Sequence, residues 1–275
     1  MMLATDRTMI AAATRATARD RQQVNDDILL PADLPVAPVR HLLVHGSAAV
    51  AFAIPRLAQL IACGLGGEKI YLTGGLAVDA AEKNLAAFAV ACGFPHFRKG
   101  ETQAAYARRL LNRQLDSLGI TAPEIVMEDG RGSGNTEENI RAAIRSSFMR
   151  HDDGTPVASV GIMGQAYHLR RAVGTVRRLA GEEAALDPKF AAAPVIIPHL
   201  VWPFGVTRHT WHLQADFISG PFYQERNRLT GTGNYYDKGF CHPVDAEDLR
   251  RQIAALPGSR PALHPYRTLN PIAHL

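Results

Sequence analysis

The sequence predicts an α/β protein: a Rossmann-like, three-layer αβα fold with a roughly five-stranded parallel sheet and an aromatic-rich C-terminal extension. Short apolar runs bounded by Gly or polar turns alternate with longer segments of helical periodicity, which is typical of βα units. The 275 residues are 47% hydrophobic and 20% charged, so the chain can bury a sizeable core. Nine of its 19 aromatic residues lie between Trp202 and Phe240, so the C-terminal part is built differently.

The chain divides into three predicted segments: an N-terminal helix and linker over 1–35, the α/β core over 36–198, and a C-terminal cap or extension over 199–275. After the core the alternation stops, and a Gly-punctuated aromatic region runs to about residue 242. Such a region is too long to be a bare loop in a compact domain. It is a lid over the ligand crevice, a small satellite core or a dimer interface, and the last alternative leaves a homo-oligomer open.

The elements follow in order along the chain. The predicted strands are 41–45, 70–73, 125–127, 157–163 and 195–197. The predicted helices lie near 6–25, 50–63, 77–92, 102–118, 136–150, 166–180 and 245–255.

Glycine and polar residues follow four of the five strands, where the ligands of open α/β sheets collect. The turns after the first two strands carry His45, Gly46, Ser47, Thr73, Gly74 and Gly75, and those after the next two carry Glu128, Ser133, Asn135, Asn139 and His168. Glycine permits close backbone approach, and a helix N-terminus can bind an anion. These turns indicate recognition of phosphate or carboxylate, although ordinary turn chemistry also explains any single one of them.

Two helix starts carry the densest polar groups. Asn135 and Glu138 have capping-box spacing, which accounts for both without a ligand but leaves Ser133 and Asn139 unexplained. His168 falls in the first turn of its helix, just beyond the sheet edge, and is expected to point toward the ligand crevice, where an imidazole can bind phosphate or transfer protons. Arg171 follows it and belongs either to the same site or to a solvated basic stripe.

Several function classes lack support. The chain has no GxGxxG after the first strand, no GxxxxGK[ST] and no GxSxG. Its histidines are not accompanied by the carboxylates of a metal-binding motif, so no metal is predicted. A charge of +4 spread along the chain is weak evidence for nucleic acid. Three isolated cysteines and the lack of a continuous apolar segment predict a cytoplasmic protein without a membrane span.

The ordered motifs LLVHGSA, IYLTGG, GETQAAY, SGNTEEN and YHLRRA resemble the SanA/ElyC/YdcF family over about residues 40–180. The segment from WPFG to YYDKGF resembles the C-terminal extension of the soluble YdcF-like branch. The resemblance implies a Rossmann-like core and S-adenosylmethionine as ligand. It also implies a pocket lined by Gly74, Gly75, Glu101, Ser133, Asn135, Glu138, Asn139, His168 and Arg171.

Two functional hypotheses follow. In the first, the protein is a transferase or hydrolase acting on an adenosyl or phosphorylated small molecule. Glu101 or Glu138 is then the acid/base, Asn139 orients the substrate, and His168 with Arg171 stabilises negative charge. In the second, the protein binds such a molecule as a regulatory module without transforming it, because the sequence shows no recognisable nucleophile or triad.

Overall fold

The structure is a computed structural model that describes residues 18–47, 49–76, 80–128, 135–187, 190, 193–203, 205–214 and 216–262. The strands are β1 (His41–Val44), β2 (Lys69–Leu72), β3 (Glu124–Met127), β4 (Ser159–Gln165) and β5 (Val195–Val201). The α-helices are α2 (Ala18–Ile28), α3 (Ile54–Ala62), α4 (Ala80–Ala91), α5 (Gln103–Leu118), α6 (Thr136–Arg145), α7 (Ala166–Leu186), α8 (Asp216–Thr230) and α9 (Ala246–Ala254). Two short 3₁₀ turns, η1 (Val50–Ala53) and η2 (Trp211–Leu213), complete the described elements.

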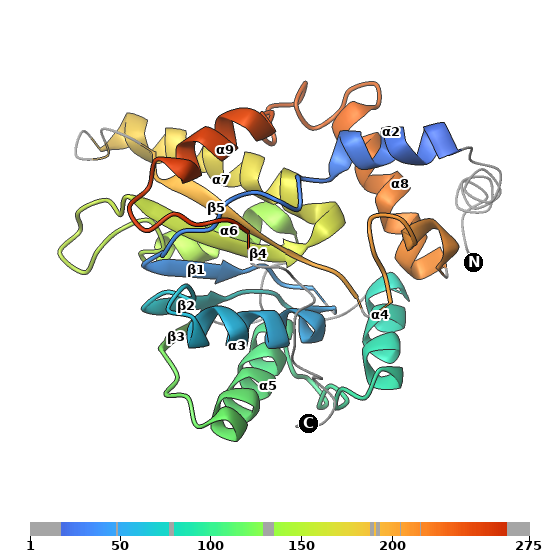
Figure 1. Cartoon of the computed structure of the whole chain (residues 1–275), viewed down its shortest axis with the longest axis horizontal. Coiled ribbons are helices and arrows are strands. Elements are labelled where there is room, and N and C mark those ends of the chain that lie inside the picture. Colours follow the sequence, from blue (N-terminus) through green and yellow to red (C-terminus); the bar gives the residue numbers. More distant parts are fainter. Residues whose placement is uncertain are drawn as a thin grey trace.

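The five strands form one parallel sheet in the order β3-β2-β1-β4-β5, which confirms the predicted Rossmann-like fold. Figure 1 shows α3 and α5 on one side of the sheet and α7 with α9 on the other. This arrangement follows from right-handed crossovers, because the chain moves outward from β1 to β3 and then returns to β4 on the opposite side. The strand order reverses between β1 and β4, so the ligand crevice of such a sheet belongs beyond these two strands.

The strands arise from apolar runs: β1, β2, β4 and β5 are largely buried, whereas the edge strand β3 is only partly buried. Every residue of β1 is buried, and its one polar side chain, His41, places Nδ1 2.8 Å from the carbonyl oxygen of Phe148. All five predicted strands are confirmed, but β4 and β5 extend to Gln165 and Val201, which pair with each other. The sequence pattern did not predict these last residues, because Gln165 and His199 are polar. With its longer range, β5 crosses the predicted segment boundary at 198.

The helices also follow local signals. The Thr102 hydroxyl accepts a hydrogen bond from the Ala105 amide at 3.2 Å and starts α5, and Gly119 ends that helix in the left-handed conformation at φ 63°. The predicted helix 136–150 ends earlier, at Arg145, because the chain turns at Ser147. The N-terminal helix is described from Ala18 to Ile28, and the earlier part of its predicted range lies outside the described residues.

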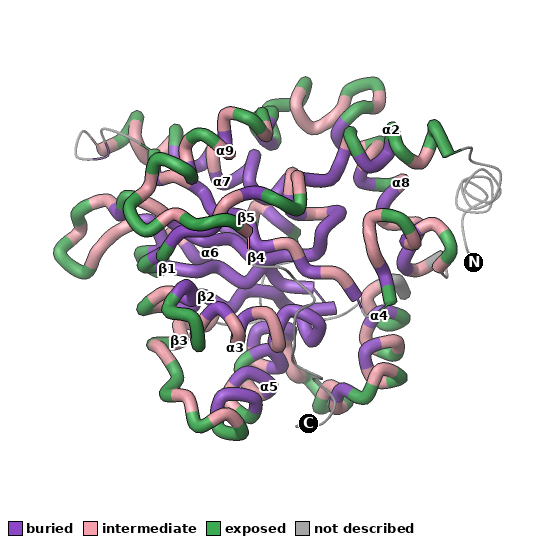
Figure 2. The backbone as a smooth tube through the Cα atoms, viewed as in Figure 1, coloured by how far each residue is buried: buried purple, intermediate pink, exposed green. Residues whose placement is uncertain are grey.

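The C-terminal extension packs against both the N-terminal helix and the sheet core. In Figure 1, α8 lies beside α2 and α4 at the end of the sheet where the strands finish. The buried apolar residues form one continuous cluster that joins α2, the sheet and the extension, and Figure 2 shows buried backbone running through all three. The three predicted segments therefore share one core.

Candidate functional site

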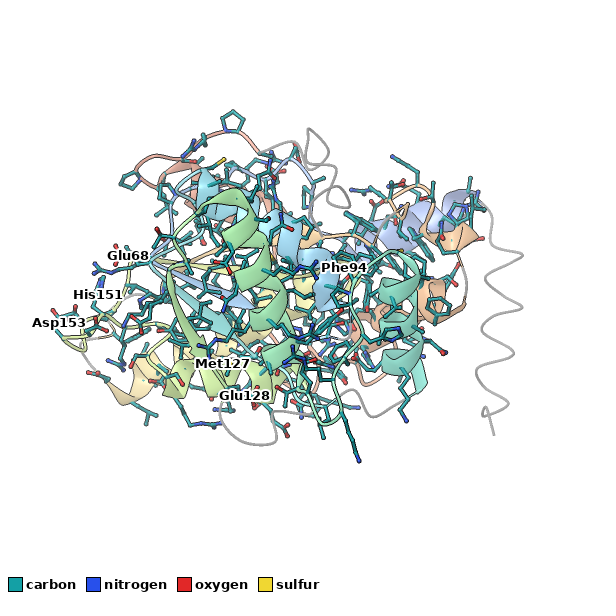
Figure 3. All side chains as sticks on the ribbon, turned by 90° about the horizontal axis from the view of Figure 1, so that it is seen from below. Glu68, Phe94, Met127, Glu128, His151 and Asp153 are labelled. Carbon is teal, nitrogen blue, oxygen red and sulfur yellow. The ribbon has the colours of Figure 1, made fainter. Side chains whose placement is uncertain are left out.

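The two edges of the sheet carry different polar groups. Figure 3 shows Glu68, His151 and Asp153 near one another at the edge where strands begin. Glu128 lies at the opposite edge, directly after Met127 at the end of β3. Its carboxylate accepts a hydrogen bond from the Gly74 amide at 2.9 Å. The predicted polar edge is therefore the carboxyl edge, and Glu128 ties the turns after β2 and β3 together.

The glycine turns after β1 and β2 pack directly against each other. A Cβ atom on Gly46 would lie 2.3 Å from the Gly74 Cα and 2.5 Å from the Thr73 carbonyl oxygen, so no side chain fits there. Gly74 also has φ +116°, a conformation that L side chains rarely adopt. The close approach explains why both positions are glycine and leaves no room for a ligand between the two backbones.

The other residues of these turns are engaged locally. The Ser47 hydroxyl accepts from the Ala49 amide at 3.1 Å, and the Thr73 hydroxyl donates to the Val44 carbonyl at 3.3 Å. The Gly75 carbonyl accepts from the Gln103 amide at 2.9 Å. The space available to a ligand must therefore lie on the β1–β4 side of the edge, where the strand order reverses.

Two histidines and an asparagine meet at that reversal. His45 follows β1 and His168 lies in the first turn of α7, with their ring centroids 6.0 Å apart in an edge-on arrangement. The side-chain nitrogen Nδ2 of Asn139, on α6, lies 3.5 Å from the His45 Nε2. Three of the predicted site residues, contributed by three elements, are thus brought together.

An ion pair between α7 and α8 completes the cluster. The Arg171 Nε donates to one oxygen of the Glu225 carboxylate at 2.5 Å, and its Nη2 donates to the other at 3.2 Å. The remaining nitrogen, Nη1, donates to the Thr136 hydroxyl at 2.6 Å. Arg228 and His168 also approach Glu225, at 3.2 Å and 3.6 Å. We call His45, Asn139, His168, Arg171 and Glu225 the switch-point cluster.

Electrostatics keep both imidazoles neutral at physiological pH. Burial, reinforced by the positive charge of Arg171, lowers the pKa of His45 to about 3. Burial and the same guanidinium hold the pKa of His168 well below its usual value. Within the cluster the charges of Arg171 and Glu225 cancel, and the neighbouring Arg228 brings the local charge to about +1. The cluster is therefore suited to an anionic partner.

A pocket of about 290 Å³ adjoins this cluster. Its lining residues come from the start of α6, from α7 and from the segment after α8: Asn135, Thr136, Glu137, Arg171, Thr175, Tyr235 and Phe240. The Arg171 guanidinium lies 5.5 Å from the centre of the Tyr235 ring. Glu225 and Thr136 occupy three of the five N–H donors of Arg171, which leaves donors for a ligand in the pocket that Arg171 lines.

The start of α6 is a capped helix N-terminus at the mouth of this pocket. The Asn135 side chain accepts from the Glu138 amide at 3.0 Å, which confirms the predicted N-cap. The Glu138 side chain itself is exposed. Burial raises the pKa of Glu137, but hydrogen bonds from Arg141 and Arg178 outweigh it and lower the pKa below its usual value. Ser133, also predicted here, lies outside the described residues.

Glu101 lies in a different environment from the switch-point cluster. Arg109 donates to both of its carboxylate oxygens at 2.8 Å, and the Arg98 amide adds a third hydrogen bond at 2.8 Å. Burial opposes ionisation, but these partners hold the pKa of Glu101 below its usual value. The carboxylate lines a second pocket beside α4, together with His96. Its contacts are those of a structural anchor.

The aromatic extension has two roles. Trp211 is fully buried, stacks on Phe222 at 4.5 Å and donates from its indole to the Asn25 side chain at 2.9 Å, so it belongs to a packed core. Tyr235 instead lines the pocket beside Arg171. Trp211 therefore belongs to the shared core and not to a satellite core, and Tyr235 lies beside the pocket. The lid and the dimer interface stay predictions.

Sequence reasoning missed Glu225, which is 0% exposed. A signal for it exists, because Glu225 lies on the stripe of α8 that carries the buried Ile218, Phe222 and Leu229. An acid in an apolar stripe needs a buried partner. That partner could not be identified without the fold.

Among the residues that the structure describes, no helix has the length and apolar character needed to cross a membrane, and no three His, Cys, Asp or Glu side chains are grouped to hold a metal ion. In comparisons with known proteins, no family model and no curated protein sequence matches this chain.

Proposed function

We propose that the protein binds a small molecule that carries an anionic group and a flat ring, of the nucleotide or S-adenosylmethionine type, in the pocket beside Arg171. The observation that carries this proposal is the arrangement of Arg171, which faces the pocket with unused donors while Glu225 and Thr136 hold it in place. Planar guanidinium groups suit bidentate binding of carboxylate or phosphate. The helix dipole at the start of α6 adds attraction for the same charge.

The lining residues fit S-adenosylmethionine, which the resemblance to YdcF-like proteins implies. Arg171 and Thr136 would hold its carboxylate, and Tyr235 with Phe240 would contact its adenine. When bound, this molecule would supply a methyl group on a sulfonium centre. A nucleotide fits the same set, with phosphate in place of the carboxylate.

We further propose that His168 transfers a proton in a transferase or hydrolase reaction. Its Nδ1 is buried and has no hydrogen-bond partner among the described residues, and its Nε2 lies 3.6 Å from Glu225. A neutral imidazole can accept the proton of an attacking water or hydroxyl group, and the nearby carboxylate would stabilise the imidazolium that forms. Asn139, 3.5 Å from His45, would orient the substrate at the reversal point.

The second candidate is a non-catalytic binding module. The low pKa values of His45 and of His168 favour it, because an imidazole that burial keeps neutral contributes hydrogen bonds more readily than it accepts a proton. Arg171 and Glu225 would then serve binding and stability alone. The two candidates share one ligand and differ in turnover.

The binding test is isothermal titration and thermal shift with S-adenosylmethionine, S-adenosylhomocysteine, ATP and AMP. A true ligand raises the melting temperature by mass action. Tyr235→Ala should weaken binding about tenfold, given the roughly 1–3 kcal/mol that base stacking on an aromatic contributes. Tyr236→Ala is the matched control, because it removes a neighbouring tyrosine that does not line the pocket, and it should leave the binding affinity unchanged. Equal effects of the two variants, or no binding of any of the four compounds, would overturn the pocket assignment.

The catalytic test follows the bound compound by mass spectrometry. The enzyme proposal expects conversion of more than one equivalent of ligand, reduced at least about 100-fold in His168→Gln with binding retained. Conversion that never exceeds the molar amount of protein would leave the binding module as the function.

A further inference from the structure

A second pocket, separate from the proposed ligand site, lies between α4 and the loop that leads to α5. Its volume of about 630 Å³ falls in the range of roughly 300–1,000 Å³ typical of small-molecule sites. The residues that line it are Leu76, Lys83, Ala86, Ala87, Val90, His96, Phe97, Arg98, Gly100 and Glu101. The pocket is open to solvent, and Lys83, His96 and Arg98 in its lining are exposed. Figure 1 shows α4 on the outside of the molecule.

One face of α4 forms an apolar wall. Ala86, Ala87 and Val90 lie on this face with helical spacing, and Lys83 precedes them at the i−3 position of Ala86. Phe97 contributes an aromatic surface and is held by stacking on Tyr106, with ring centroids 3.8 Å apart. The wall offers apolar contact area to an aliphatic chain.

The opposite rim is a rigid turn. The Glu101 amide donates to the Arg98 carbonyl at 3.0 Å, and the Arg98 amide donates back to the Glu101 carboxylate at 2.8 Å. Gly100 supplies the positive φ of 73° that this turn needs. Arg109 fastens the turn to α5 through Glu101 and through the His96 carbonyl at 2.9 Å. The rim is therefore fixed before any ligand arrives.

The pocket carries a net positive charge. Arg109 compensates the negative charge of Glu101, so Lys83 and Arg98 remain as cations in the lining. A cationic rim over an aliphatic wall complements a molecule with one anionic head and one apolar tail.

We propose that this pocket binds a monocarboxylate with an unbranched alkyl chain, its tail on α4 and its carboxylate on Lys83 and Arg98. Burial of each methylene contributes about 0.8 kcal/mol. The two cations supply preference for a carboxylate over an alcohol of the same length. Glu101 is then a positioning residue for the rim, and it does not contact the ligand.

The experiment is isothermal titration of the full-length protein at low ionic strength with sodium octanoate and with 1-octanol. Octanoate should bind more tightly than 1-octanol to the unmodified protein. Lys83→Glu should weaken octanoate binding about fivefold, which corresponds to roughly 1 kcal/mol for one surface charge, and should leave 1-octanol unaffected. Arg251→Glu, the same charge reversal on the exposed surface of α9, is the matched control.

A second variant tests the apolar wall. Ala87 is exposed on α4, so Ala87→Trp fills the pocket without disturbing the core. This variant should weaken the binding of both octanoate and 1-octanol. The proposal is overturned if octanoate does not bind, if it binds no better than 1-octanol, or if Lys83→Glu behaves like Arg251→Glu. Because Tyr235→Ala leaves this pocket intact, failure of the nucleotide site would not alter these results.

Discussion

Arg171 and Glu225 lie 54 positions apart in the sequence and form a buried ion pair between α7 and α8. Glu225 is fully buried and Arg171 is 7% exposed, so neither charge is solvated by bulk water. Such a pair is weak evidence for net stability, because desolvation offsets most of the attraction. Removing only one of the two charges nevertheless lowers stability strongly, because the other charge stays buried without a partner.

Glu225→Gln should therefore lower the free energy of unfolding by about 3–5 kcal/mol, measured by urea denaturation. Arg40→Ala, which breaks the exposed pair with Glu68 at 2.9 Å, should change it by less than about 1 kcal/mol. Similar losses in the two variants would mean that Arg171 finds another counter-charge when Glu225 is neutral.

His199 gives a pH-dependent contribution to stability. Burial, with a smaller effect of Arg56, lowers its pKa to about 3, and neither ring nitrogen has a hydrogen-bond partner among the described residues. Between pH 6.5 and pH 3 the unfolded chain binds this proton and the folded chain does not, so stability falls as pH falls through that window.

His199→Leu should remove about 1.4 kcal/mol per pH unit from the slope of unfolding free energy between pH 6 and pH 4. Stability at pH 7 should change little, because an unpaired polar group is replaced by an apolar one. The measurement is urea denaturation at several pH values. An unchanged slope would show that the folded state protonates His199 at an ordinary pH.

At the scale of elements, the turns after β1 and β2 are fixed by backbone contact. Gly46→Ala would place a methyl group 2.3 Å from the Gly74 Cα, and the two turns would have to separate.

Gly46→Ala should cost about 1–3 kcal/mol, the usual penalty of overpacking. Gly181→Ala in α7, where a Cβ meets nothing within 4 Å, should instead stabilise by about 0.5–1 kcal/mol. Thermal unfolding of the two variants compares the same chemical change in closed and open surroundings. A stable Gly46→Ala protein would contradict the observed contact.

Local patterns predict most of these elements. An apolar run such as Leu42–Val44 must lie in a buried parallel strand, and Asn135 marks a helix start through its own side chain. The predicted strand ends were wrong where a strand contains polar residues, as β5 does at His199. Such residues are tolerated only because neighbouring strands and helices bury them, and that information is not local.

At the scale of the molecule, the sheet order confirms the fold that alternating patterns predicted. Parallel strands bring the residues after their ends to one edge, which is why His45, Asn139, His168 and Arg171 could be grouped in advance. Tyr235 was expected only as one of several aromatic residues of a lid, and Glu225 could not be predicted, because no periodicity determines how the extension returns to the sheet. The predicted site therefore covers the part that strand order dictates and lacks the part that α8 supplies.

A chain ending at Trp202, directly after β5, should lose cooperative unfolding. It would lack Glu225 opposite Arg171 and would leave the buried Val24 and Ile28 of α2 without their partners on α8. Circular dichroism in the near and far ultraviolet during heating is the measurement. A sharp transition at the melting temperature of the full chain would show that the core folds alone.

The pairing of α2 with α8 has a consequence for synthesis on the ribosome. Arg226 of α8 reaches Asp27 of α2 at 2.7 Å, and Trp211 reaches Asn25, so these two contacts form only after all five strands have emerged. Arg170 of α7, by contrast, donates to the carbonyl oxygens of Asp26 and Asp27 and precedes β5 in the chain. Until then the nascent chain carries an apolar helix face and an uncompensated Arg171. The α2–α8 contact and the Arg171–Glu225 ion pair can therefore form only after α8 has been translated.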